Sequence, residues 1–220
     1  MAYDRWRLAA HDVAARMGIP RRCARPELAD ARATLNGVDE DFQNEEELAS
    51  HYGPDGPVVA ALAWLHFVLG DDLKAAWAKT DPNFRLVLAQ AFLWANRAHP
   101  VVIGHDLEKT AQALASLAFN HDLWLSFEET QLADFHKAFD DFFAGNFGAG
   151  SRPRPVGLDL EIVKFVRTES DAPMLFTEPT MVRAHVLLLH ATSNEWLVAG
   201  RGVDTPPVPG WPPTPGHPSY

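Results

Sequence analysis

Arg183 and His185 are the residues whose types and spacing best suit chemistry. They lie two positions apart in a segment that alternates like a strand, from Thr180 to His190. Side chains two positions apart on a strand share one face, and Leu187 belongs to the same face. A buried arginine binds a carboxylate, and a histidine can transfer a proton near neutral pH. The alternative is that this alternation marks only the solvated face of a half-exposed strand.

If the face is concave, it lines a pocket. We then expect His185 to be the catalytic residue. The ligand-binding residues would be Arg183, His185, Leu187 and Trp196, the last from the next predicted strand. A buried arginine needs an acid, and Glu161 or Glu178 is the expected partner. The expected ligand is a hydrophobic or carboxylate-bearing small molecule, with no cofactor.

Histidines in the predicted helices raise the question of a metal site. The candidates are His66, His99, His105, His121 and His136, and two of them precede an aspartate. None is spaced from a carboxylate in the HExxH manner, and Asp106 has a simpler role as a helix cap. Cys23 is the one cysteine, so zinc sites built on cysteines and disulfides within the chain are excluded. We therefore expect no metal.

Helical signals fill the first two thirds of the chain. Pro57 begins an apolar stripe that Gly70 ends, and Asp71 and Asp72 can cap a short helix containing Trp77. Asp81-Pro82 begins a longer helix that ends before Pro100, with an apolar stripe of Phe84, Leu88, Ala91 and Ala95 at helical spacing. Two further helices are predicted, one from Asp106 to Asn120 and one over Glu128–Phe143, with phenylalanines facing inward.

Strand signals follow a stretch rich in glycine and proline, residues 145–157, which is predicted to be a loop. Residues 158–162 and 180–190 alternate between apolar and polar, and Met174–Phe176 is a candidate short strand. Ser193-Asn194 predicts a tight turn that joins the second strand to a strand over 195–201. Residues 205–220 hold seven prolines, which predicts an extended tail, anchored by Trp211 and dispensable for folding.

This order of elements predicts an α+β fold with three parts: a helical N-terminal arm at 1–45, one α+β domain at 46–204 and a Pro-rich C-terminal tail at 205–220. The formal charge is −10, from 19 basic and 29 acidic residues. Such a chain repels nucleic-acid backbones and anionic lipid surfaces, so the main domain is not expected to bind nucleic acid or membranes. No secretory or membrane-spanning segment is visible, which favours a cytoplasmic protein.

The segments LEIVKFVR and MVRAHVLLLHATSNEWLVAGRG, preceded by LGDDLKAAWAKTDPNFRLVLAQAFLWANR, make residues 55–203 resemble the nuclear transport factor 2-like superfamily. The resemblance implies helices packed on a curved, cone-like antiparallel sheet with a cavity inside. Members include isomerases, dehydratases, polyketide cyclases and non-catalytic binding modules. The isomerase and dehydratase sites rely on tyrosines, whereas Tyr3, Tyr52 and Tyr220 all lie outside the predicted sheet.

Three functions stay open at this point. The first is a non-catalytic cone-fold module that binds small molecules or proteins and forms a homodimer through an apolar outer sheet face. The second is a small-molecule isomerase, dehydratase or cyclase that uses His185. The third is a DNA-binding regulator that uses helices within residues 4–35. A cavity filled by Phe and Trp, with His185 outside it, would favour the first function.

Overall fold

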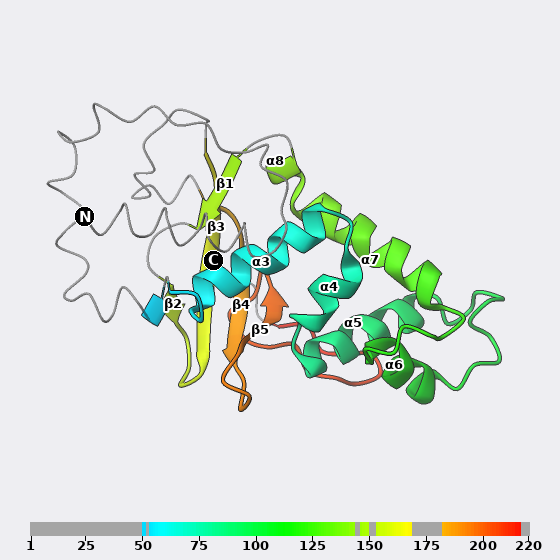
Figure 1. Ribbon diagram of the computed structural model, residues 1–220. Helices are drawn as coiled ribbons and strands as arrows, with labels where there is room; N and C mark the ends of the chain where they lie inside the picture. Colours follow the sequence, from blue (N-terminus) through cyan, green and yellow to red (C-terminus); the bar gives the residue numbers. More distant parts are fainter. Residues whose placement is uncertain (1–49, 52, 144–145, 150–152, 169–181, 217–220) are drawn as a thin grey trace, which may run out of the picture.

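The fold is seen in a computed structural model, which describes residues 50–51, 53–143, 146–149, 153–168 and 182–216. The predicted helices of the N-terminal arm and the predicted strand Met174–Phe176 lie outside these ranges. The described part has the predicted α+β class. Its helices come first in the chain and its strands follow (Figure 1).

The strands form one antiparallel sheet. Its members are β1 (Asn146–Ala149), β2 (Arg154–Pro155), β3 (Leu160–Thr168), β4 (Val182–His190) and β5 (Trp196–Arg201). The order is β1-β3-β4-β5, and β2 pairs with β3 beyond the end of β1. The sheet is neither closed nor strongly curled, so the described residues do not form the predicted cone.

The helices pack on one face of this sheet and extend past its edge. They are α3 (Pro57–Leu69), α4 (Leu73–Ala78), α5 (Pro82–Ala95), α6 (Leu107–Ala115), α7 (Trp124–Ala138) and the single turn α8 (Asp140–Phe143). Figure 1 shows α3 lying across the sheet, with α5, α6 and most of α7 beyond it. The molecule therefore has a sheet end and a helical end.

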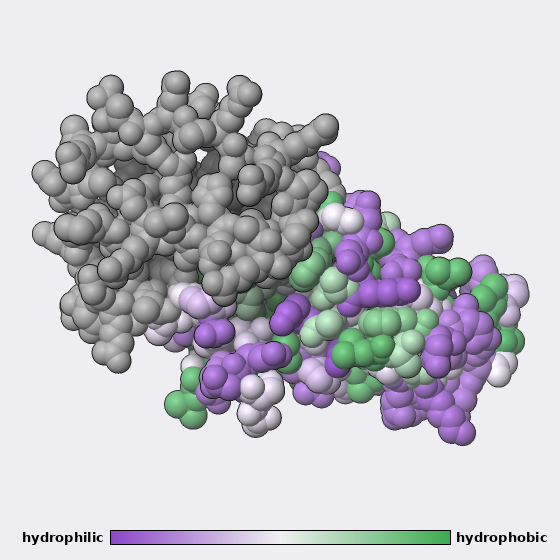
Figure 2. All heavy atoms as spheres, viewed as in Figure 1, coloured by the Kyte–Doolittle hydropathy of each residue, from purple (hydrophilic) through white to green (hydrophobic). Residues whose placement is uncertain are grey.

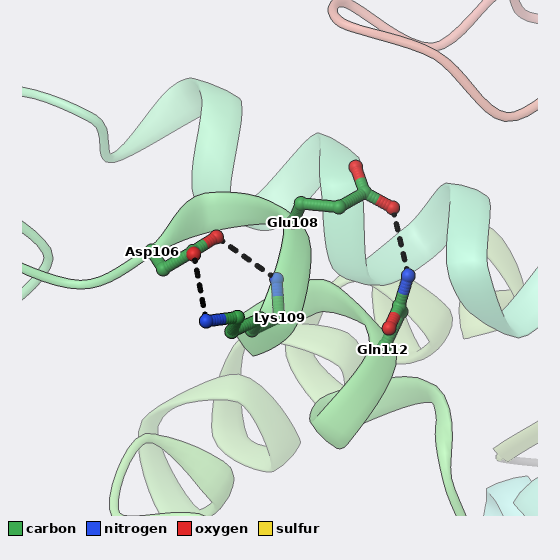
Figure 3. A network of polar contacts seen from close by, with 4 residues as sticks. All are labelled: Asp106, Glu108, Lys109 and Gln112. Atoms are coloured by element: carbon green, nitrogen blue, oxygen red, sulfur yellow. Dashed lines mark hydrogen bonds and ion pairs between the residues drawn. The ribbon is translucent and has the colours of Figure 1, made fainter.

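The predicted caps account for three helix starts. The Asp72 side chain accepts a hydrogen bond from the backbone of Ala75. Asp81 accepts from Asn83 and Phe84, at 2.9 and 3.2 Å, and Asp106 accepts from Lys109. Each carboxylate satisfies N–H groups that have no partner within the helix. Figure 3 shows the Asp106 cap together with the Glu108–Gln112 contact one turn further along α6.

Three helices differ from prediction, and one of them, α6, ends at Ala115 rather than at Asn120. In α5 the predicted stripe included Ala91 and Ala95, but both are exposed and the buried face centres on Ala89, Phe92 and Leu93. The last long helix begins at Trp124 rather than Glu128 and breaks into α7 and α8 at Phe139. In α5, packing against neighbours on several sides decides which face is buried.

The predicted loop at 145–157 contains two strands. Phe147, Gly148 and Ala149 of β1 pair with β3, and Arg154 of β2 pairs with Ile162. Both strands are short, and their glycines and prolines are typical of loops. They are strands because the long strand β3 supplies hydrogen-bond partners, which local sequence does not reveal.

The Pro-rich tail is not extended in its described part, residues 205–216. Val208 and Thr214 exchange two backbone hydrogen bonds of 2.9 Å, which closes a small loop. This loop lies on α5 and α6. The backbone of Gly210 donates to Gln90 Oε1 at 2.8 Å, and Trp211 Nε1 donates to Glu108 Oε2 at 2.7 Å. Trp211 also packs against the core, as predicted for an anchor.

Candidate functional site

The space between helices and sheet is filled by aromatic side chains. Trp64 of α3 is fully buried, and its ring contacts Phe135 and Phe139 at centroid distances of 5.3 and 5.8 Å. Phe139 and Phe142 then both contact Phe165 of β3 at 6.2 Å. A ligand cavity in a cone fold would lie at this interface, and these rings occupy it.

Trp64 is also held by a hydrogen bond. Its Nε1 donates to Thr80 Oγ1 at 3.0 Å, and this buried hydroxyl donates in turn to the carbonyl of Ala76 at 2.8 Å. The short segment around Thr80 also bridges to β5, because Asp81 N donates to Val198 O and Val198 N donates to Lys79 O. The filled interface and the covered edge of β5 therefore form one connected unit.

The four predicted ligand-binding residues are not all on one face. Val186 of β4 belongs to the core under the helices, so its neighbours His185 and Leu187 face the other side of the sheet. Trp196 packs against that core, on the helix side. The side chain of Arg183 lies outside the described part of the structure. Only His185 and Leu187 of the set are seen together.

A polar cluster surrounds His185. Arg154 Nη2 donates to Asp204 Oδ2 at 3.0 Å, and both side chains lie close enough to His185 to act on its charge. Lys164 pairs with His185 across β3 and β4. Burial lowers the pKa of His185 and outweighs the opposing effect of the Asp204 carboxylate, while Arg154 lowers the pKa further. The neutral imidazole is therefore favoured, and it can accept a proton.

Two members of this cluster lie in segments for which the sequence predicted no chemical role. Asp204 lies at the boundary with the tail, and Arg154 lies in the predicted loop. Gly202 has a φ of 65°, and its N–H donates to the carbonyl of His185 at 3.1 Å, so the chain turns back over β4 at this point. Asp204 Oδ1 is buried and accepts no hydrogen bond from the described residues.

The predicted acid Glu161 is not near His185. It faces the opposite side of the sheet, since it pairs with Leu188, and its Oε2 lies 3.4 Å from His51 Nδ1. Glu178 lies outside the described residues. The acid beside His185 is therefore Asp204. Strand pairing could not predict this neighbour, because Asp204 lies outside the strands.

A hollow of about 150 Å³ opens at the helical end of the molecule. Residues from the end of α5, the following connection and the start of α7 line it: Phe92, Asn96, His99, Val101, Val102, Leu123, Ser126 and Thr130. Its floor is firm because Phe92 packs on Phe127, which in turn contacts Trp77. We call this hollow, with its surrounding surface, the α5–α7 groove.

Local hydrogen bonds shape the groove. The Asn96 side chain donates to the carbonyl of Phe92 at 2.8 Å and closes α5. The backbone of Val101 donates to His99 Nδ1, and the backbone of Leu123 donates to His121 Nδ1. His99 and His121, two of the histidines considered as metal ligands, thus accept backbone hydrogen bonds in turns. His105 and His121 also contact each other, at 5.6 Å between rings, and connect the two loops.

Large apolar side chains are exposed beside the groove. Val101 is 51% exposed, Ile103 62% and Leu125 70%. Single exposed apolar residues are ordinary on protein surfaces, but Val101 itself lines the groove, and Ile103 and Leu125 are each next to a lining residue in the sequence. Figure 2 shows apolar and polar surface side by side over the helical end.

Among the described residues, no group of three or more His, Cys, Asp or Glu side chains is placed to hold a metal ion. None of the described helices is both long and apolar enough to cross a membrane. In comparisons with known protein families, curated proteins and solved structures, nothing matches this chain.

Proposed function

We propose that this chain is a non-catalytic protein-interaction module. The observation that carries the proposal is the filled interface between helices and sheet, where Trp64, Phe139 and Phe165 occupy the volume that a ligand would need. Small-molecule sites are enclosed concavities that bury most of the ligand. The α5–α7 groove is instead open to solvent, with exposed apolar side chains in and beside it, which suits the surface of a protein partner.

The resemblance to the nuclear transport factor 2-like superfamily stays a proposal. Its support is the order of elements, with helices first and then long antiparallel strands that end in a hairpin. Within that superfamily the filled interface would place this chain with the non-catalytic modules.

A thermal-shift screen tests the proposal. Hydrophobic and carboxylate-bearing small molecules are screened against the full chain and against Trp64→Ala, which opens a cavity at the interface. We expect no stabilisation of the unmodified chain, while indole stabilises Trp64→Ala and shows that the assay detects binding inside. Stabilisation of the unmodified chain by a molecule that NMR contacts place between α3 and the sheet would overturn the proposal.

A second candidate function is small-molecule proton transfer by His185, and the cluster with Asp204 and Arg154 favours it. A carboxylate ligand would displace Asp204 from Arg154, and the neutral imidazole would accept a proton. In this case a carboxylate found in the screen should lose its effect in Arg154→Ala. His185→Gln should keep the binding and lose turnover. If both variants respond like the unmodified chain, this candidate is wrong.

The other two expectations carry less support. A DNA-binding role for residues 4–35 falls outside the described residues, and the charge of −10 opposes it. A homodimer through the outer sheet face was expected because Leu187 and Leu189, or Val186 and Leu188, would remain on that face. Leu187 is fully buried within the single chain, whereas Leu189 is half-buried, and the homodimer stays a prediction.

A further inference from the structure

We infer that the α5–α7 groove binds a protein segment that inserts one apolar side chain and carries basic residues beside it. This inference rests on the proposed function and deepens it by naming the chemistry of the partner. It follows from the size of the hollow, the chemistry of its walls and the charge around its mouth.

The size fits a single side chain. The hollow measures about 150 Å³, and a cavity of that order holds one benzene ring. Phe92, Val102 and Leu123 give it apolar walls, and the aromatic contacts of Phe92 keep its floor in place. One leucine side chain or one phenylalanine ring would fill the hollow. Val101, which lines the hollow and is half exposed, would contact a flanking residue of the same segment.

The charge around the opening is negative. Ser126 and Thr130 line the groove from α7, and Glu129 lies on the same exposed side of this helix. Asp122 precedes the lining residue Leu123, and its side chain is 81% exposed. Arg97, next to the lining residue Asn96, keeps its positive charge while it stacks on Trp94 at 4.5 Å and donates to the carbonyl of the same residue. The two acids outnumber this cation, so the charge around the opening stays negative.

These acids select a basic neighbour for the apolar anchor. Electrostatic complementarity at an interface rim mainly sets specificity and association rate, whereas a buried anchor supplies most of the affinity. The net charge of −10 acts in the same direction over longer distances. An acidic segment would be repelled at this rim. An uncharged apolar segment would gain no electrostatic attraction there.

The experiment is a selection of short random peptides displayed on phage against the full chain. We expect the enriched peptides to carry one Leu or aromatic residue with Lys or Arg within a few positions. Ser126→Trp plugs the hollow from an exposed position and should abolish their binding. Glu129→Lys combined with Asp122→Lys should weaken it about tenfold, and the effect should shrink at high salt.

Two control variants carry the same changes far from the groove. Ser193→Trp and Glu195→Lys alter exposed residues of the β4–β5 turn, and both should bind like the unmodified chain. Circular dichroism on each variant checks that it is folded.

Each other outcome counts against the inference. Enriched peptides that are acidic, or that bind Ser126→Trp normally, would overturn the groove as the site while leaving an interaction module in place. A selection without enrichment also overturns it. If a small molecule binds between α3 and the sheet in the thermal-shift screen, the proposed function fails as well, and the two failures are thus distinguishable.

Discussion

Single residues in this protein show how burial changes the role that a side chain can take. His185 is half-buried on the sheet face away from the helices, beside Asp204 and Arg154. Arg85 of α5 is half-buried near Asp81, and its Nε and Nη1 are buried without a hydrogen-bond acceptor in the described structure. Burial lowers the pKa of both groups because it disfavours their charged forms.

His185 should make stability depend on pH. Its pKa in the folded chain lies below the ordinary value of 6.5, so the unfolded chain binds the proton more readily. The stability from the neutral imidazole is complete above pH 6.5 and is lost as the pH falls below 6.5 and through the folded pKa. We expect His185→Gln to flatten this part of the stability curve in urea titrations. His99→Gln, at an exposed position, serves as the control.

Arg85→Met should stabilise the chain. A buried guanidinium without an acceptor costs free energy, and methionine keeps the length of the aliphatic part while removing that cost. We expect a gain of about 1 kcal/mol in the free energy of unfolding. Arg97→Met, which removes an exposed arginine just beyond the opposite end of α5, is the comparison. A clear loss of stability in Arg85→Met would mean that Arg85 has a partner in solution.

At the scale of elements, the tail and the 79–81 segment act as covers. Residues 79–81 bridge to the free edge of β5, and the tail loop covers buried Gln90 on α5. An uncovered sheet edge and an unpaired buried amide are both unfavourable. These covers explain why the tail has fixed contacts despite its prolines.

Tail truncation therefore has a stronger expected effect than the proline content predicts. Removal of residues 205–220 exposes Gln90, takes away the ring of Trp211 and frees Glu108. We expect the melting temperature to fall by roughly 5 °C or more, since about 2 kcal/mol is lost in a domain of this size. Trp211→Phe, which keeps the ring packing but loses the bond to Glu108, should fall between truncation and the full chain. If truncation lowers the melting temperature by only a degree, the tail is dispensable for folding, as the sequence predicted.

At the scale of the whole molecule, the outer face of the sheet is the open question. Ile162 and Leu187 on that face are as buried as the core beneath the helices. An exposed apolar face would favour pairing of two sheets, and a buried one does not. Exposed apolar area is found instead at the helical end and at Leu158 before β3.

The homodimer is tested by light scattering coupled to size exclusion. A monomer has a mass of 24.4 kDa, and a dimer through the sheet face would double it. If a dimer forms, Leu158→Lys, which changes a fully exposed side chain beside β3, should shift the equilibrium toward monomer. If the measured mass equals that of one chain at every concentration, the prediction of a homodimer is wrong.

Local sequence determined the elements with strong signals. Asp72, Asp81 and Asp106 begin helices as predicted because a carboxylate and its N–H partners lie within three residues. The alternation in β4 and the turn at Ser193-Asn194 could also be predicted, since both depend on neighbours along the chain. The α+β class followed from the order of these elements.

Tertiary structure decided the rest, because the partners lie far apart in sequence. The strands β1 and β2 exist only through pairing with β3, and the tail loop depends on Gln90 and Glu108, which are about a hundred positions away. The same holds for the candidate sites. His185 meets Asp204 and Arg154 across a folded sheet, and the α5–α7 groove forms where two loops meet. Helical spacing predicted that the phenylalanines of the last long helix face inward, and they do. Only side-chain packing brought them against Trp64 and Phe165 and so filled the interface.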